Sequence, residues 1–159
     1  MAVIGWPLAF GAAHGAFPVA ISRHGPRLGW HDGQPGRANL LGLGPLGLGA
    51  ALVAWALVAH YTAAPTYGWV VRRRLAPEYL LMHGPYRVTR NPMYLGELAI
   101  WCGWTLLLGS PPVAGTLLLG AAVMRGVVEF EERSLAAHYG EEWRAYASRT
   151  PRWLQPTLG

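Results

Sequence analysis

Two polar clusters hold most of the side chains in this sequence that could do chemistry. The first, residues 83–94, reads His-Gly-Pro-Tyr-Arg-Val-Thr-Arg-Asn-Pro-Met-Tyr and lies between two long apolar stretches. The second, residues 129–132, contains three glutamates and follows the next apolar stretch. Side chains of these types could serve an acid/base enzyme, a metal site or a polar cofactor. We therefore take the two clusters as the candidate reaction site.

The signatures of several other chemistries are missing. The sequence has no HExxH motif, and His83 and His138 are too isolated to form a compact ligand group, so we predict no metal. Classical nucleophilic triads also lack their motifs. The glycines of residues 42–49 lie in an apolar run with no strand before it, which favours helix packing over a dinucleotide-binding turn. The one cysteine, Cys102, cannot form a disulfide within the chain.

A zwitterionic cofactor fits these side chains better. Arginine can bind a carboxylate through two parallel hydrogen bonds, while glutamate can accept from an amino group, a ribose hydroxyl or a cationic centre. Gly84 and Pro85 would form a turn that lets the backbone approach such a ligand closely.

The elements that position these clusters are membrane helices. Hydrophobic residues make up 52% of the chain and charged residues only 13%, and several uncharged runs approach the roughly 20 residues that a spanning helix needs. All 13 basic residues are arginines. They lie beside apolar segments, where a topology signal explains them better than nucleic acid does. We predict an all-α, polytopic membrane bundle of about four spans, in contact with membrane lipids and forming a single domain over residues 1–159.

Three uncharged runs define the spans. Residues 1–22 form the first, with Gly11 and Gly15 as a packing pair, and a loop over residues 23–37 follows. The second run, residues 38–71, should be helical between Pro45 and Pro65, and three arginines at 72–74 end it. These two spans make up residues 1–71, and residues 72–159 form the expected cofactor-binding core.

The third run, residues 98–124, is interrupted by Ser-Pro-Pro at residues 110–112. Each half alone would be about 18 Å of helix, too short for a hydrocarbon core of about 30 Å. We therefore extend one arm back to Pro92 and the other on to Phe130, which predicts a C-terminal helical hairpin. The arginine-rich loops before and after the hairpin place both termini and the candidate site in the cytoplasm.

The hairpin sets which residues face one another. With Pro111 as the tip, residues at equal distance along the two arms are Glu97 and Arg125, Asn91 and Glu131, and Arg90 and Glu132. Charges near a bilayer are costly unless they are paired. The first pair is therefore either a structural salt bridge or the lining of a polar pocket.

A cytoplasmic amphipathic helix should follow the last span. Leu135, Tyr139, Trp143 and Tyr146 recur at spacings of three and four, with an interruption at Gly140. We interpret this aromatic stripe as an interfacial anchor or a lid. Glu132 opens the stripe and Glu131 stands beside it, so one of the two carboxylates should face packed protein.

Four motifs over about the last eighty residues together resemble a known superfamily. They are His-Gly-Pro-Tyr-Arg at 83–87, Arg-Asn-Pro-Met-Tyr-Leu-Gly at 90–96, Glu-Glu-Arg-Ser-Leu at 131–135 and Tyr-Gly-Glu-Glu-Trp-Arg-Ala-Tyr at 139–146. This combination resembles the isoprenylcysteine carboxyl methyltransferase and phospholipid methyltransferase superfamily of membrane enzymes. The first two spans match it only in hydropathy.

The resemblance implies a methyltransferase that binds S-adenosylmethionine at its cytoplasmic side. It implies cofactor contacts for nine residues: His83, Gly84, Tyr86, Arg90, Asn91, Pro92, Tyr94, Glu131 and Glu132. Asn91 stands where many relatives carry histidine, which removes support for a proton-transfer role there but keeps a hydrogen-bonding one.

The acceptor is expected to be lipidic, or small and membrane-partitioning. A sulfonium cofactor supplies an activated methyl group, so the protein mainly aligns donor and acceptor and excludes water. Because the sequence shows no clear general base, a prenylcysteine-type carboxylate or an ionised thiol is favoured over an amine. We place Glu97 and Arg125 near the acceptor as catalytic candidates.

Two other functions fit parts of the pattern. One is an NADPH-dependent membrane reductase of a lipidic enone, because sterol-reductase-type enzymes resemble this superfamily in their terminal region. The other is a non-enzymatic scaffold whose charges only stabilise helix packing. Transfer of a labelled methyl group, oxidation of NADPH, or neither, separates the three.

Overall fold

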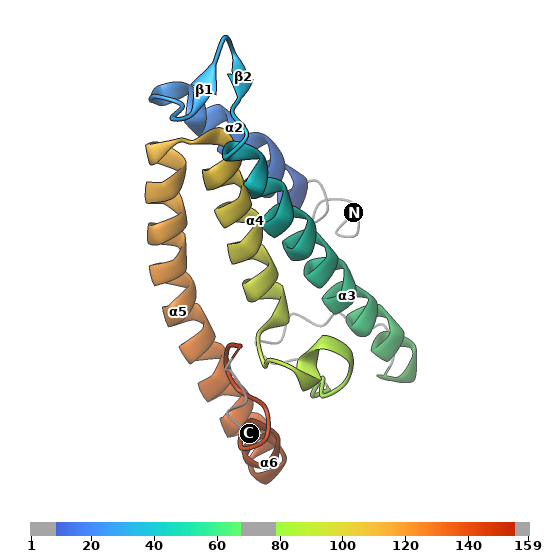
Figure 1. Cartoon of the computed structure of the whole chain (residues 1–159). Coiled ribbons are helices and arrows are strands. Elements are labelled where there is room, and N and C mark those ends of the chain that lie inside the picture. Colours follow the sequence, from blue (N-terminus) through green and yellow to red (C-terminus); the bar gives the residue numbers. More distant parts are fainter. Residues whose placement is uncertain (1–8, 68–78, 155–159) are drawn as a thin grey trace, which may run out of the picture. The chain divides into compact units, whose positions relative to one another are not determined.

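The computed structural model describes residues 9–67 and 79–154, and nearly all of its elements are helical (Figure 1). This confirms the predicted all-α class. The α-helices are α2 (Phe17–Ile21), α3 (Leu43–Tyr67), α4 (Pro92–Leu108), α5 (Pro111–Tyr139) and α6 (Glu141–Ala147). Shorter turns are the π-helix η1 (Ala12–Ala16) and the 3-10 helices η2 (Ser22–His24), η3 (Asn39–Gly42) and η4 (Gly84–Arg87). The predicted stop at arginines 72–74 lies outside the described residues.

Two segments of the described chain are long and apolar enough to cross a membrane, Asn39–Ala63 and Pro111–Tyr139. Only 22% and 11% of their apolar stretches are buried inside the protein. Large apolar side chains therefore lie on the surface, with Leu48 73% exposed and Leu118 71% exposed. A water-soluble protein would cover an apolar surface of this extent. These helices indicate an integral membrane protein.

Local signals explain where the helices begin and end. Proline is the first residue of both α4 and α5, where its missing N–H leaves no hydrogen bond unmade. Gly109 follows α4 with φ +56° and Gly140 follows α5 with φ +52°, positive values that glycine adopts without the steric cost of a Cβ. The predicted breaks at residues 110–112 and at Gly140 are confirmed. α3 includes both Pro45 and Pro65, each within three residues of an end.

The first of two compact units comprises residues 1–50 and 96–122. Here α3 and α4 approach closely at glycines, because a Cβ at Gly49 would lie 2.5 Å from the carbonyl oxygen of Gly96 and 2.8 Å from the amide of Ile100. A Cβ at Gly42 would collide in the same way with the backbone of Gly103. The predicted packing role is confirmed for these two glycines. For four others it stays a prediction, because a Cβ there would meet no described atom within 4 Å: Gly11, Gly15, Gly44 and Gly47.

The loop predicted for residues 23–37 contains a short antiparallel hairpin, β1 (Trp30–His31) with β2 (Gln34–Pro35). Asp32 and Gly33 both have positive φ, as a tight hairpin turn requires. Nearby, Asn39 fixes the end of α4, since its Nδ2 donates to the carbonyls of Leu28 (3.0 Å) and Leu106 (2.9 Å).

The second unit comprises residues 51–95 and 123–159. In it the C-terminal tail packs on the first polar cluster: the Tyr146 hydroxyl donates to the carbonyl of Tyr86 (2.7 Å), and the Arg90 amide donates to the carbonyl of Pro151 (2.9 Å). Trp143 and Tyr146 are only 6% and 5% exposed. These two side chains pack inside the protein, which does not fit an anchor at the membrane interface, and the alternative of a lid stays a prediction.

Candidate functional site

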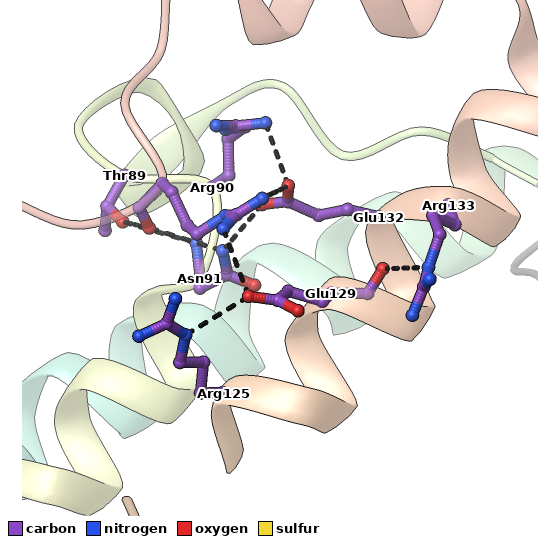
Figure 2. Close-up of polar contacts among 8 residues, drawn as sticks. Thr89, Arg90, Asn91, Arg125, Glu129, Glu132 and Arg133 are labelled. Carbon is purple, nitrogen blue, oxygen red and sulfur yellow. Dashed lines mark hydrogen bonds and ion pairs between the residues drawn. The ribbon is translucent and has the colours of Figure 1, made fainter. Parts of the chain in front are cut away.

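The candidate site lies wholly within the second unit and joins the two polar clusters (Figure 2). Its charged residues form a chain of alternating sign. Arg90 pairs with Glu132 (3.2 Å), which also pairs with Arg152 (2.7 Å), and Arg152 pairs in turn with Glu129 (3.9 Å). Arg125 pairs with Glu129 at 3.2 Å. We call these five residues, together with Asn91, the charge cluster. The predicted proximity of Arg90 to Glu132 is confirmed.

Glu132 is at the centre of the cluster and is only 8% exposed. Its Oε1 accepts from Asn91 Nδ2 (3.3 Å) and Arg152 Nε (3.1 Å). Its Oε2 accepts from Arg90 Nη1 (3.2 Å), and from Arg152 through Nε (3.1 Å) and Nη2 (2.7 Å). A buried carboxylate is tolerated only when it is paired in this way. Figure 2 shows Arg90 and Asn91 reaching Glu132 from the segment that precedes α4.

Local structure holds Arg90 and Asn91 in place. Thr89 is 1% exposed, its Oγ1 donates to the carbonyl of Arg152 (2.8 Å), and the same oxygen accepts from the Asn91 amide (3.3 Å). The carbonyl of Asn91 accepts from Leu95, which starts the helical ladder of α4. Pro92 then fixes the first turn. The two site residues are therefore anchored by a helix start on one side and by the tail on the other.

Glu131 is exposed, unlike Glu132, and its Oε1 accepts from the Tyr94 hydroxyl at 2.8 Å. The expectation that one of the two carboxylates faces packed protein is confirmed, and the buried one is Glu132. A carboxylate in this position can receive a cationic or hydrogen-bond-donating ligand from solvent.

The η4 turn presents a second polar edge. Gly84 has φ +59°, and a Cβ added there would be 3.5 Å from both Ala59 and the Trp55 indole, so this turn lies against α3. The Tyr86 hydroxyl is 3.0 Å from His60 Nε2. Burial raises the pKa of Tyr86, with Tyr146 and Glu131 adding to the effect, so its hydroxyl stays protonated. His83, beside the turn, is exposed.

The two predicted catalytic residues, Glu97 and Arg125, each contact a different residue instead of each other. Glu97 belongs to the first unit, where His14 Nε2 lies 3.8 Å from its Oε2. Arg125 belongs to the second unit and pairs with Glu129, with 80% of its side chain exposed. Their proposed role near the acceptor stays a prediction. Among residues 9–67 and 79–154, no group of three or more histidine, cysteine or acidic side chains could hold a metal ion.

Two residues of this region were not predicted from the sequence, Arg152 and His60. Glu129 belongs to the second polar cluster, and the structure pairs it with Arg125 and Arg152. His60 lies in an apolar run, with nothing nearby in the sequence to single it out. Arg152 follows α6 in a tail whose position depends on tertiary contacts, and the hairpin arithmetic that paired Arg90 with Glu132 does not extend to it.

Residues 39–142 match the sequence model of a family described as phospholipid methyltransferase. An uncharacterized protein of Haemophilus influenzae is 33% identical over 63 residues, which cover 39% of this chain and all of that protein. No solved structure matches the chain. The family match contains both polar clusters and ends before Arg152.

Proposed function

Because the chain belongs to the phospholipid methyltransferase family, we propose that it transfers a methyl group from S-adenosylmethionine to a lipidic or small membrane-partitioning acceptor. The family and the apolar helices together indicate a membrane methyltransferase. The observation that carries the choice of cofactor is the charge cluster, in which Arg90 and Asn91 contact Glu132, with the exposed Glu131 next to it in the same unit.

The residues present fit this cofactor by their chemistry. S-adenosylmethionine carries a carboxylate, an ammonium group, a sulfonium and ribose hydroxyls. The cluster offers guanidinium groups for the first, and the exposed Glu131 offers a carboxylate for a cation or a hydroxyl. Tyr86 and Tyr94 add hydroxyl groups beside them.

We assign the cofactor to the surface formed by the η4 turn, the start of α4 and the paired glutamates. The residues proposed to form it are His83, Gly84, Tyr86, Arg90, Asn91, Pro92, Tyr94, Glu131 and Glu132. Bound there, S-adenosylmethionine supplies a methyl group already activated by the sulfonium. The protein then has to fix the orientation of donor and acceptor and keep water out. Glu132 contributes by holding Arg90 and Asn91 in fixed positions, and Tyr86 contributes a hydroxyl that remains a donor.

The acceptor we favour is a prenylcysteine-type carboxylate, which needs no base before it attacks. Glu97 and Arg125 are the residues proposed to lie near it. The name of the matched family makes a phospholipid amine the competing acceptor. An amine must lose a proton first, and His60 beside Tyr86 is one group in the second unit that could accept it.

We further propose that the chain crosses the membrane four times, with α4 and α5 as a hairpin and with the site and both termini in the cytoplasm. The support is the length of the apolar segments and the concentration of arginine around the candidate site. An acceptor with a lipid chain could then enter at the depth of the membrane interface.

Calorimetry and a methyl-transfer assay on the purified protein in detergent test this proposal. We expect saturable binding of S-adenosylmethionine and transfer of labelled methyl to a prenylcysteine acid or to a phospholipid amine. Arg90→Gln should weaken binding, whereas Glu141→Gln, which changes an exposed carboxylate of α6, should not. Oxidation of NADPH with a lipidic enone and no affinity for S-adenosylmethionine would establish the reductase instead. Binding of neither S-adenosylmethionine nor NADPH would favour the third alternative, a non-enzymatic scaffold.

A further inference from the structure

Arg152 lies beyond the motifs that carry the family resemblance, yet its backbone is fixed on the first polar cluster. Its carbonyl accepts from Thr89 Oγ1 (2.8 Å) and from Asn91 Nδ2 (3.2 Å). The preceding carbonyl, of Pro151, accepts from the Arg90 amide (2.9 Å). These contacts are made by the main chain of the tail, so they hold the position whatever side chain residue 152 carries.

Glu132 has no acceptor site left for a ligand. A carboxylate offers about four lone-pair sites. Four donor nitrogens of Arg90, Asn91 and Arg152 already reach its two oxygens at 2.7–3.3 Å, with Arg152 Nε shared between the two. An ammonium group could bind Glu132 only by displacing one of these donors, which would leave a buried guanidinium or amide unpaired.

Arg152, in contrast, has donors to spare. Its Nε and Nη2 donate to Glu132, whereas its Nη1 lies 3.9 Å from Glu129 Oε1, beyond hydrogen-bond distance. In addition, 38% of its side chain is exposed, compared with 15% for Arg90. The charge cluster contains three arginines against two glutamates, which leaves one positive charge uncompensated.

We propose that Arg152 binds the carboxylate of S-adenosylmethionine and that Glu132 holds Arg152 in place without contacting the cofactor. This inference rests on the proposed function, because it names a binding residue for the same ligand. The guanidinium is planar, so one edge can bind Glu132 while the rest of the fork faces a second carboxylate. The ammonium group of the cofactor is then left to Glu131, the exposed glutamate of the pair.

The experiment compares two ligands and three variants by calorimetry in one detergent. The ligands are S-adenosylmethionine and its decarboxylated form, which keeps the amine, the sulfonium and the adenosine. Arg152→Gln removes the charge but can still donate to Glu132. Arg152→Lys keeps the charge without the fork. Arg149→Gln is the matched control, since Arg149 is an exposed arginine of the same tail whose Nε donates to the carbonyl of Ala145.

We expect the unmodified protein and Arg149→Gln to prefer S-adenosylmethionine over the decarboxylated ligand by about tenfold to a hundredfold, the strength of one charge-assisted contact. Arg152→Gln should lose this preference through weaker binding of S-adenosylmethionine alone, with affinity for the decarboxylated ligand unchanged. Arg152→Lys should keep part of the preference, and it carries the test if Arg152→Gln fails to fold.

Equal losses for both ligands in the Arg152 variants, or no loss for either, would overturn the inference and leave the proposed function standing. No binding of either ligand to the unmodified protein would instead overturn the proposed function, and this inference with it. Thermal unfolding midpoints above the titration temperature ensure that a weak signal reflects binding rather than unfolding.

Discussion

The same substitution should affect protein stability very differently at the two adjacent glutamates, Glu131 and Glu132. Glu132→Gln removes the negative charge between Arg90 and Arg152, whereas Glu131→Gln alters a carboxylate with solvent on one side and the Tyr94 hydroxyl on the other. We expect Glu132→Gln to reduce stability strongly. Glu131→Gln should leave stability nearly unchanged and weaken cofactor binding.

The magnitude follows from burial. Breaking a buried ion pair by removing one partner costs about 3–5 kcal/mol. The Arg90 side chain is 15% exposed, so losing its pair with Glu132 should cost most of that free energy. Arg152 is 38% exposed, so solvent screening makes the loss of its pair with Glu132 smaller. The loss for Glu132→Gln is therefore about 3 kcal/mol, or roughly 6–12 °C in midpoint for a chain of this size. For Glu131→Gln the amide oxygen can still accept from Tyr94, and the loss should stay below about 1 kcal/mol.

Thermal unfolding followed by tryptophan fluorescence in one detergent measures the difference. Glu141→Gln is the control, since Glu141 is exposed and its substitution should leave the midpoint in place. The difference in midpoint between Glu131→Gln and Glu132→Gln should persist in about 1 M salt, because salt at that concentration screens exposed ion pairs but not a buried one. Midpoints for Glu131→Gln and Glu132→Gln within about 2 °C of each other would refute the assignment of the buried role to Glu132.

Two further predictions concern packing and pH. Gly49→Ala should destabilise the protein by about 1–3 kcal/mol, because its Cβ would press on the backbone of Gly96. Gly47→Ala is the control and should be neutral or slightly stabilising, because a Cβ there meets no described atom within 4 Å. The thermal unfolding midpoints of the two variants measure the difference. Burial raises the pKa of Tyr146 to about 12, above the pKa of about 10 that tyrosine has in the unfolded state. The stabilising effect of the protonated hydroxyl should therefore be complete below about pH 10. It should be lost between about pH 10 and 12, because the unfolded state loses its proton first. Tyr146→Phe should therefore cost about 1 kcal/mol at pH 8, through the lost hydrogen bond to Tyr86, and progressively less above pH 10; a constant difference across this range would contradict the raised pKa.

Much of the secondary structure is predictable because its signals are local. Pro92 and Pro111 start helices, and Gly109 and Gly140 end them, through backbone constraints that act within one or two residues. The contact between Arg90 and Glu132 is predictable as well, because equal counting from Pro111 along the two expected helical arms pairs these residues. The turn of the short β1–β2 hairpin also has a local signal, because an Asp-Gly pair such as Asp32-Gly33 favours a tight hairpin turn.

The aromatic stripe shows where local periodicity fails. Trp143 and Tyr146 have the spacing and amphipathic character of a membrane-interface anchor, and the sequence does not tell which apolar surface covers them. In the structure Trp143 lies under Arg90, with the guanidinium carbon 5.7 Å from its ring centroid, and Tyr146 donates to the backbone of the η4 turn. Trp143 therefore packs against the charge cluster, and Tyr146 against the η4 turn.

The different roles of the two glutamates follow from helix geometry together with one contact that the sequence does not encode locally. Adjacent residues on an α-helix point about 100° apart, so a pair at the edge of a buried stripe must place one carboxylate inside and one outside. One buried and one exposed carboxylate could therefore be predicted. Which of them binds a ligand depends on the residues that already pair with the buried one, Glu132. Arg152 occupies it, held by main-chain contacts to Thr89 and Asn91 that bring the tail back over a long stretch of chain. Because those contacts use the backbone of the tail, the inner glutamate is paired before any ligand arrives, and the outer glutamate and the remaining donors of Arg152 are the groups left to bind one.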